Sequence, residues 1–439
     1  MVRTKRLLAH GMAALFLALV LLPGSALAKT EIQWWHANTG FLGERITEIV
    51  NKYNSSQNDY EVKAVYKGGY PETLTAGIAA YRAKTQPHLI QVFEVGTQTM
   101  LSSGAIYPVY QLMKEQGIKI DWADFLGVIR SYYSQKGELY SMPFNSSTAI
   151  LYYNRTIFKK AGLDPTKPPK TYEEIEKAAK ACVTKGWAKV GFSASWPSWT
   201  LVENAHAWHD QPFSDMDNGF KGMATKLRIN GDFGVKMWTL LTRWQKEGIF
   251  TYAGRGSKGD QSVINGEAAI GLASTALVGT LTKTAKFDWG TGNLPRMAGY
   301  PQGNSIIGGA SLWVMKGKKA EEYKGVASFL AFLANPEQQA WWHAATGYLP
   351  VSKSALAALQ KTDHFQRNPD MWTAFNQIMS GKTTANSQGI RLGNFVAVRD
   401  TIEAELENVV GGKKTPKQGL DDAVKKGDSI LKEFASMYK

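Results

Sequence analysis

Small polar side chains stand immediately before an apolar run near the middle of the chain. Asn145, Ser146 and Ser147 follow Pro143 and precede the apolar and aromatic segment 149–153. We interpret the polar residues as a turn and the apolar segment as a mostly buried strand. Short hydroxyl groups and open backbone N–H groups at a strand mouth can bind an anion. The stretch therefore predicts either an ordinary polar turn or part of an anion-binding site.

A guanidinium group near the C-terminus could bind the same kind of ligand. Arg399 has a planar fork of donors that suits a phosphate or a carboxylate. The alternative is an exposed salt bridge to one of the acids that follow it, Asp400, Glu403, Glu405 or Glu407. Glu94 is a second candidate, because a carboxylate accepts hydrogen bonds from ligand hydroxyl groups. Its rival role is that of a catalytic acid, although no obvious carboxylate partner lies near it in sequence.

Aromatic residues are abundant, with 14 Trp and 18 Tyr, and many fall in loops at predicted strand ends. Those that do not follow helical core spacing are Tyr70, Tyr172, Trp196, Trp199 and Tyr348. Their faces can pack against the C–H groups of a polar ligand, while the Tyr O–H and Trp N–H groups donate hydrogen bonds. The alternative is core filling, which we expect for most aromatic residues of the chain.

The elements expected in the first part of the chain would bring such residues to one edge of a sheet. The alternation of strands and helices predicts an α/β fold with a parallel sheet, the strands at 31–36, 60–66 and 89–95 and the helices at 42–53 and 72–84. Ligands of open α/β sheets bind outside the carboxyl ends of the strands. His36, Tyr70 and Glu94 all lie at or just beyond the carboxyl end of a predicted strand.

Residues 1–28 have the pattern of a secretory signal peptide. Arg3, Lys5 and Arg6 precede an apolar run at 12–22, and Ala-Leu-Ala follows at 26–28. We expect cleavage after Ala28, an exported mature chain and no later membrane span. The alternative is an uncleaved anchor. The part after residue 28 is longer than one hydrophobic core usually serves, so two lobes are expected.

The chain is basic, with 51 Lys and Arg against 37 Asp and Glu and a net charge of +14. A basic surface attracts anionic ligands by long-range steering. Nucleic acid is the obvious rival partner. The cations are scattered over predicted helix faces with acids nearby, however, and no basic stripe or nucleic-acid-binding motif is present. We therefore expect a solvated basic surface and no nucleic-acid partner.

Sequence signatures of enzymes are absent. His206 and His209 lack the i, i+4 spacing of a His-Glu-x-x-His zinc motif, and there is neither a Gly-x-Ser-x-Gly elbow nor a Walker loop. Cys182, the single cysteine, lies in a helical pattern and cannot form an internal disulfide. We expect a buried structural thiol, no metal, no cofactor and no catalytic residue.

Across essentially the whole mature chain, the sequence resembles the extracytoplasmic solute-binding proteins of ABC importers, and among them the family that binds sn-glycerol 3-phosphate. The resemblance rests on several distinctive segments, at 66–70 (Tyr-Lys-Gly-Gly-Tyr), 76–80, 91–97, 143–148, 306–315, 346–350 (Thr-Gly-Tyr-Leu-Pro) and 391–394. It implies a type II periplasmic binding fold, with two α/β lobes joined by crossing strands and a ligand cleft between them. The lobes would comprise 29–145 with 309–346, and 146–308 with 347–439.

The resemblance also implies the ligand contacts, which are Tyr70, Glu94, Ser147, Ser274, Gly309, Tyr348 and Arg399. Arg399, Gly309, Ser147, Ser274 and Tyr348 would bind the phosphate, Glu94 the glycerol hydroxyls, and Tyr70 the other end of the ligand. Tyr172 stands where the family often has Trp, which would leave room for phosphodiesters such as glycerophosphocholine; Trp199 is a further packing candidate. Another departure is the Asn-Thr-Gly segment 38–40, where relatives can carry an acid.

The family would make this a periplasmic monomer that delivers sn-glycerol 3-phosphate to the membrane subunits and ATPase of an importer. Three alternatives remain. A neutral sugar would suit the tryptophans but would not need Arg399. An exported phosphodiesterase would form product from glycerophosphocholine and would need metal ligands, for which no cluster is evident. A surface adhesin would bind no small ligand.

Overall fold

The computed structural model describes residues 28–438. The predicted signal peptide, except for Ala28, lies outside the described residues, so its cleavage stays a prediction. The strands expected at the start of the chain are confirmed as β1 (Thr30–His36), β2 (Tyr60–Tyr66) and β3 (Leu89–Phe93). The helices between them are α1 (Gly40–Ser56) and α2 (Tyr70–Arg82). In none of the described helices is there an apolar stretch long enough to cross a bilayer.

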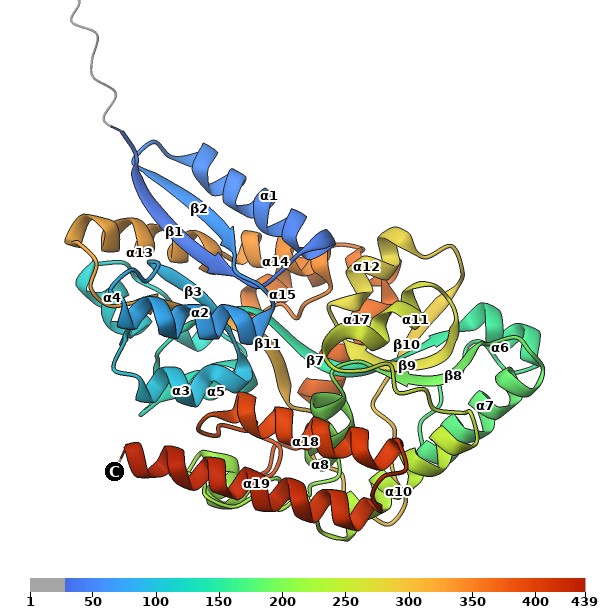
Figure 1. Cartoon of the computed structure of the whole chain (residues 1–439). Helices are drawn as coiled ribbons and strands as arrows, with labels where there is room; N and C mark the ends of the chain where they lie inside the picture. Colours follow the sequence, from blue (N-terminus) through green and yellow to red (C-terminus); the bar gives the residue numbers. More distant parts are fainter. Residues whose placement is uncertain (1–27, 439) are drawn as a thin grey trace, which may run out of the picture.

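The strands form one mixed sheet that runs through the whole molecule (Figure 1). Its order is β2-β1-β3-β11-β7-β9-β8, with β4 (Ile106–Tyr107) beside β11 and β10 (Trp289–Gly292) beside β7. At one end β2, β1 and β3 are parallel, and at the other β8 (Val190–Ala194) and β9 (Ala268–Ser274) are parallel. Between them, β11 (Ile307–Met315) and β7 (Met142–Asn154) pair antiparallel. We call the β1–β3 end the first lobe and the β8–β9 end the second lobe.

Helices cover both ends of this sheet. Those around the first lobe include α1, α2, α3 (Thr97–Ser102), α4 (Val109–Glu115), α5 (Gly127–Tyr132), α13 (Ala320–Ala334), α14 (Pro336–Thr346) and α15 (Lys353–Gln360). Those around the second include α6 (Arg155–Ala161), α7 (Tyr172–Thr184), α8 (Asn204–Trp208), α10 (Asp232–Lys246), α11 (Asp260–Ile264), α12 (Leu277–Thr284) and α17 (Pro369–Ser380). Shorter turns lie at α9 (Asp215–Gly219) and α16 (His364–Arg367).

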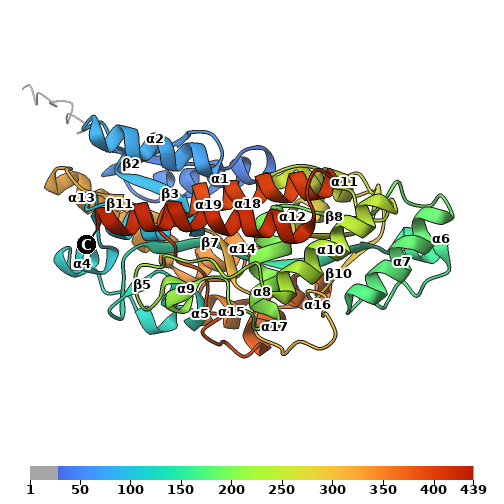
Figure 2. The same ribbon diagram turned by 60° about the horizontal axis from the view of Figure 1, so that its bottom comes forward.

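Two long helices close the chain. α18 (Phe395–Val410) and α19 (Pro416–Met437) pack side by side, and both contact α10 (Figure 2). The Thr415 side chain caps α19 by accepting a hydrogen bond from the backbone N–H of Gln418. In return, the Gln418 side chain accepts a hydrogen bond from the backbone N–H of Thr415. The opening turn of α18 reaches the segment after β3, so this helix brings Arg399 to the junction of the lobes.

The polar stretch 145–147 is not a turn, and this sequence prediction is wrong. β7 runs unbroken from Met142 to Asn154, and each of its residues is buried. Two polar side chains of the strand have distant partners: Gln91 Nε2 donates to Asn145 Oδ1 at 2.9 Å, and Thr148 Oγ1 donates to the carbonyl of Ile306 at 2.9 Å. The buried Ser146 Oγ has no hydrogen-bond partner among the described residues. Buried polar groups with partners of this kind are tolerated in a strand.

β7 is shared by both lobes. Its first half, 142–148, pairs with β11, and its second half, 149–153, pairs with β9. The polar residues therefore mark the place where the strand changes partner and passes from one lobe to the other.

Candidate functional site

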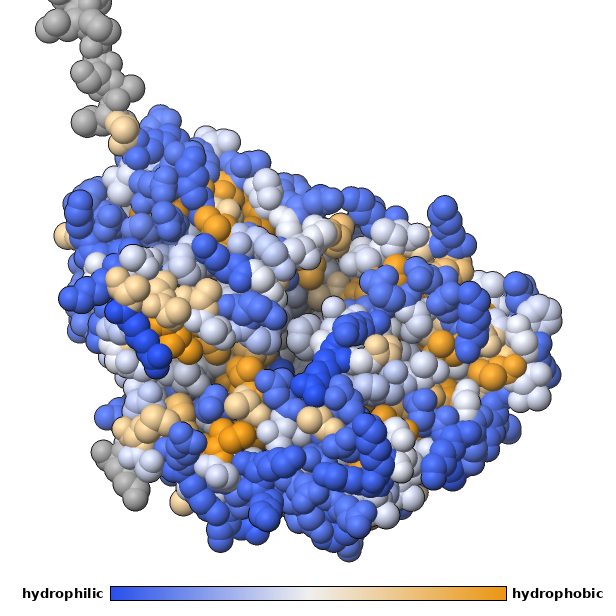
Figure 3. Space-filling model, in the orientation of Figure 1, coloured by the Kyte–Doolittle hydropathy of each residue, from blue (hydrophilic) through white to orange (hydrophobic). Residues whose placement is uncertain are grey.

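A cleft of about 480 Å³ lies where the two lobes meet. In the space-filling view it is the hollow between the first lobe and the second lobe (Figure 3). All seven contacts implied by the sequence line it, namely Tyr70, Glu94, Ser147, Ser274, Gly309, Tyr348 and Arg399, and Trp199 lines it as well. They come from strand ends and helix starts of both lobes, so residues more than three hundred positions apart meet at one cavity.

Tyr172 does not line the cleft, which corrects its assignment as a ligand-packing residue. It is 3% exposed at the start of α7, and its ring packs near those of Trp244 and His209 at 6.2 and 6.3 Å. Thr171 caps the helix by accepting from the Glu174 N–H, as predicted, and this capping directs Tyr172 into the core of the second lobe. A smaller ring at this position therefore adds no room to the cleft.

Arg399 forms ion pairs with two carboxylates from distant parts of the chain. Its Nη2 donates to Glu94 Oε1 at 2.8 Å and to Glu203 Oε2 at 2.6 Å, and its Nε donates to Glu203 Oε1 at 2.8 Å. The side chains of all three are at most 9% exposed. The salt bridge to an acid of its own helix, which the sequence left open, is not formed; Arg255 pairs with Glu407 there instead.

This ion cluster has a definite charge. Burial raises the pKa of Glu94, with the neighbouring Glu203 adding to the rise and Arg399 opposing it. Burial alone would lower the pKa of Arg399, but the two carboxylates outweigh it and raise that pKa. Because one guanidinium faces two acids, the cluster carries no spare positive charge for a ligand phosphate. Its exposed edge instead offers a carboxylate oxygen and N–H groups side by side, which suits neighbouring hydroxyl groups.

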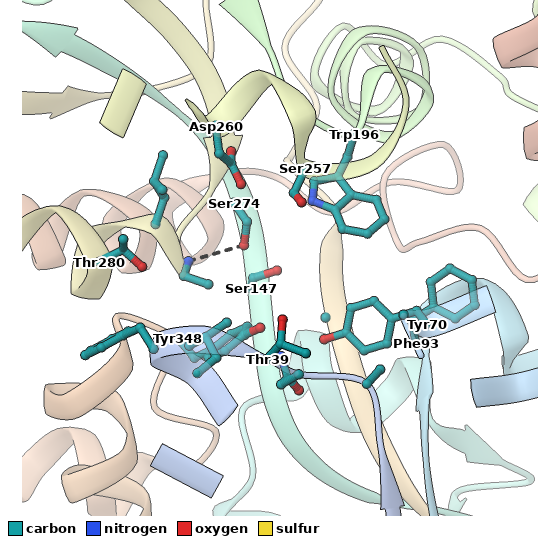
Figure 4. A pocket seen from close by; sticks show the side chains of 18 of the residues that line it. Thr39, Tyr70, Phe93, Ser147, Trp196, Ser257, Asp260, Ser274, Thr280 and Tyr348 are labelled. Carbon is teal, nitrogen blue, oxygen red and sulfur yellow. Dashed lines mark hydrogen bonds between the residues drawn. The ribbon is translucent and has the colours of Figure 1, made fainter. Parts of the chain in front are cut away.

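The middle of the cleft is lined by neutral donors (Figure 4). Ser147 lies on β7 and Ser274 ends β9, where its Oγ accepts a hydrogen bond from the Ala276 N–H at 3.2 Å and keeps its own hydrogen to donate. Burial raises the pKa values of Tyr70 and Tyr348, so both phenols stay protonated at neutral pH. Such O–H groups can bind a phosphate without carrying charge.

Gly309 has to be glycine at this place. Its φ of 81° is in the left-handed region, and a Cβ there would lie 1.9 Å from the carbonyl oxygen of Asn145. The residue is paired across the ladder with Ser146, and the β11 ladder shifts register just beyond it. Backbone without a side chain therefore borders the cleft between the lobes.

Aromatic rings form one wall, and the sequence had not marked all of them as site residues. Tyr70 and Phe93 stack with ring centroids 5.3 Å apart and planes within 5°, and Trp196 lies 6.2 Å from Tyr70. Trp199 opens the turn η3 (Trp199–Glu203), and its buried Nε1 has no hydrogen-bond partner among the described residues. Trp196 had been noted only as a loop aromatic; its tight loop and neighbouring Trp199 were the available signal.

Asp260 is a second acid of the cleft, and no sequence pattern pointed to it. It opens the short helix α11, where an acidic residue is ordinary. Its carboxylate accepts a hydrogen bond from Ser195 Oγ. Burial raises the pKa of Asp260 to about 6. Asn38 and Thr39 also line the cleft, from the loop after β1.

The two histidines that were considered as metal ligands form hydrogen bonds with backbone carbonyl groups four residues earlier in the chain. Nδ1 of His206 lies 2.7 Å from the carbonyl of Val202, and Nδ1 of His209 lies 2.7 Å from that of Ala205. Burial lowers the pKa of each to about 4, so both rings are neutral. Within residues 28–438 no group of three or more His, Cys, Asp or Glu is placed to hold a metal ion.

Two α/β lobes on a shared pair of antiparallel strands, with a polar and aromatic cleft between them, define a two-lobed ligand-binding protein. The family model of bacterial extracellular solute-binding proteins matches residues 48–373. The chain is 43% identical to the sn-glycerol-3-phosphate-binding periplasmic protein UgpB of Pectobacterium atrosepticum, over 97% of each chain. It is 42% identical to UgpB of Escherichia coli K12, covering 97% of this chain and 98% of the relative.

Solved structures share the fold. UgpB from Mycobacterium tuberculosis in complex with glycerophosphocholine has a TM-score of 0.78 at 23% identity and covers 92% of this chain and 99% of its own. Maltose-bound MalE3 from T. maritima has a TM-score of 0.76 at 16% identity, over 91% and 100%. The chain therefore belongs to the bacterial extracellular solute-binding proteins and, within them, to the family of the periplasmic UgpB proteins.

Proposed function

We propose that this protein is the periplasmic binding component of an ABC importer and that it captures sn-glycerol 3-phosphate, or a diester built on it, in the cleft between the lobes. The observation that carries the proposal is the pairing of two unlike surfaces in one cavity. Neutral hydroxyl donors lie at its centre, and the Glu94–Arg399 ion pair lies at one end.

The centre of the cleft supplies what a phosphate group needs. Ser147, Ser274 and Tyr348 each present an O–H group from a different element, and Gly309 lets backbone approach closely. Because these groups are fixed by strands and a helix end, their dipoles are oriented before the ligand arrives. A phosphate bound here would be held by neutral donors, and its charge would be stabilised by hydrogen bonds rather than by a free cation.

The ion-paired end supplies what glycerol needs. A diol can donate to Glu94 and accept from Arg399 at the same time, because the intramolecular hydrogen bonds of Arg399 use Nε and Nη2 and leave the Nη1 N–H groups to donate. The stacked rings of Tyr70 and Phe93 offer an apolar face for the C–H groups of the same moiety. We therefore reassign Arg399 from the phosphate to the hydroxyl end of the ligand.

The crossing strands give the site a way to close. β7 carries Ser147 and β11 carries Gly309 at the point where both strands pass between the lobes, so a ligand held there would pull on the connectors themselves. We propose lobe boundaries near 145/146 and 308/309. Ser354 donates to Asp124 at 3.0 Å, which favours adding α15 to the first lobe. Closure would present the loaded protein to the membrane subunits of the importer.

A neutral sugar is the second candidate, because Trp196 and Trp199 line the cleft and sugar-binding proteins share the fold. Isothermal titration of the mature chain from Lys29 with sn-glycerol 3-phosphate, glycerophosphocholine and maltose separates the two. We expect one-to-one binding of a glycerol phosphate ester and none of maltose. Binding of maltose alone would overturn the proposal.

A further inference from the structure

Asp260 is an acid of the cleft wall that the proposed contacts do not use. Among the described residues it accepts one hydrogen bond, from Ser195 Oγ, and it has no cation within salt-bridge distance. It differs in this from Glu94, whose charge Arg399 offsets. A carboxylate that is partly buried and unpaired is costly unless something compensates it.

The position of Asp260 in the cleft is fixed by two joined loops. Ser195 bonds to Asp260, and the next residue, Trp196, donates its backbone N–H to the carbonyl of Gly256 at 2.7 Å. Trp196 has a φ of 51°, a strained conformation for a bulky side chain, and its ring lines the cleft. Figure 4 shows Asp260, Ser257 and Trp196 on one side of the cleft, above Ser274 and Ser147.

Among phosphate esters, the charges that line the cleft favour those with less negative charge. Asp260, Glu94 and Arg399 line the cavity, and Glu203 binds Arg399 from behind. In this set of charges, one guanidinium offsets only part of the charge of three carboxylates. A phosphate monoester carries about −1.5 to −2 charge at pH 7, whereas a diester carries a single negative charge at that pH. A diester with an amine on its second arm is neutral overall and would place a positive group where the structure has an unpaired acid.

We propose that Asp260 and Trp196 form a head-group subsite for the cationic arm of a zwitterionic glycerophosphodiester. The inference rests on the proposed function, since the phosphate must lie against Ser274 and Ser147 for the second arm to reach Asp260. The carboxylate offsets the ammonium charge, and the indole face binds the same cation through its π electrons. A quaternary ammonium, which cannot donate hydrogen bonds, fits this pair of groups.

The direct test is the variant Asp260→Asn, which removes the charge and keeps an oxygen for Ser195. Three ligands are titrated against it and the wild type: glycerophosphocholine, sn-glycerol 3-phosphate and glycerophosphoglycerol, a diester without a cation. We expect glycerophosphocholine to bind the variant about tenfold more weakly, while glycerophosphoglycerol is unchanged and sn-glycerol 3-phosphate binds equally well or better.

The outcomes separate the two proposals. An equal loss for all three ligands would assign Asp260 a purely structural role and overturn the subsite, as would unchanged glycerophosphocholine binding. If the wild type binds none of the three, the proposed function itself fails. Gln261→Ala, at the neighbouring cleft residue, is the matched control, and it should leave the ratio between glycerophosphocholine and glycerophosphoglycerol unchanged.

Discussion

The cleft contains two acids in opposite situations. At one end Glu94 is paired with Arg399, which also binds Glu203, and the charges are compensated within the fold. On the second-lobe wall Asp260 has a hydroxyl as its partner, and no cation is in contact with it. A compensated acid contributes mainly geometry and stability. An uncompensated acid changes which ligand is preferred, because its charge is still available to be offset by the ligand.

The largest expected effect is at the compensated end. Arg399→Ala would leave two buried carboxylates unpaired, which costs about 3–5 kcal/mol of the free energy of unfolding and removes binding of every ligand. Urea denaturation and titration calorimetry measure the two effects. Arg255→Ala is the control, since Arg255 and its partner Glu407 are both more than a third exposed. That pair contributes about 1 kcal/mol or less. Similar losses in the two variants would remove the contrast between the ends of the cleft.

Between the two ends, Gly309 tests whether backbone approach defines the centre. Gly309→Ala would place a Cβ against the Asn145 carbonyl at 1.9 Å, so the strands must shift. We expect a loss of about 2 kcal/mol or more in stability and a large loss of affinity, measured by thermal unfolding and calorimetry. Gly299→Ala is the matched control. The φ of Gly299 is 86° and nothing lies within 4 Å of the added Cβ, so the loss of stability in this variant comes from backbone strain alone. Equal losses would show that conformation, not contact, decides.

The phenol of Tyr348 should matter for affinity more than for folding. Tyr348→Phe removes one O–H donor from the centre of the cleft while the ring stays stacked on Trp342 at 6.2 Å. We expect all phosphate esters to bind about tenfold more weakly, since a hydrogen bond to a charged group contributes about 1.5–3 kcal/mol. Tyr172→Phe changes the same atom in a tyrosine outside the cleft and should leave affinity unchanged. A larger effect from Tyr172 than from Tyr348 would contradict the assignment.

The smallest effect is the pH dependence at the uncompensated end. Asp260 has a pKa of about 6, so lowering the pH from 7 to 5 protonates it and removes its attraction for a cation. Affinity for glycerophosphocholine should then fall several-fold in the wild type. Tyr152 and Tyr348 are close enough to Asp260 to feel its charge. Burial raises the pKa values of both phenols, so they do not titrate between pH 5 and 7.

Two comparisons isolate the Asp260 contribution in that experiment. Glycerophosphoglycerol reports any titration of Glu94 or general loss of structure, because it binds the same centre without a cation. In Asp260→Asn the difference between the two diesters should no longer vary with pH. A difference that persists in the variant would assign the pH dependence to another group.

How much the sequence could reveal differs between these regions. The strands that precede Tyr70 and Glu94 followed from periodicity, and the role of the cleft residues followed from the resemblance of whole segments. The partners of Arg399 could not be foreseen, because Glu203 and Glu94 lie 196 and 305 residues away. The polar stretch of β7 looked like a turn because the partners of Asn145 and Thr148, which are Gln91 and Ile306, are also distant in sequence, by 54 and 158 residues.

Asp260 is a cleft residue that the sequence did not reveal, and Tyr172 is a predicted ligand-packing residue that lies in the core. An acid at the start of a short helix has an ordinary local explanation, so nothing in the sequence separated Asp260 from a surface residue. A tyrosine after a capping threonine looked available to a ligand, yet the orientation of α7 turns it into the core. Tertiary packing decides which face of an element lines the cleft, and local sequence patterns do not predict it.

The central claim is that the cleft binds a glycerol phosphate ester through neutral donors at its centre. The most direct measurement is calorimetric titration of the mature wild-type protein and Tyr348→Phe with sn-glycerol 3-phosphate and glycerophosphocholine. The account predicts one-to-one binding by the wild type and about tenfold weaker binding by the variant for both ligands. No binding of either ester by the folded wild type, or equal affinity in the variant, would contradict it.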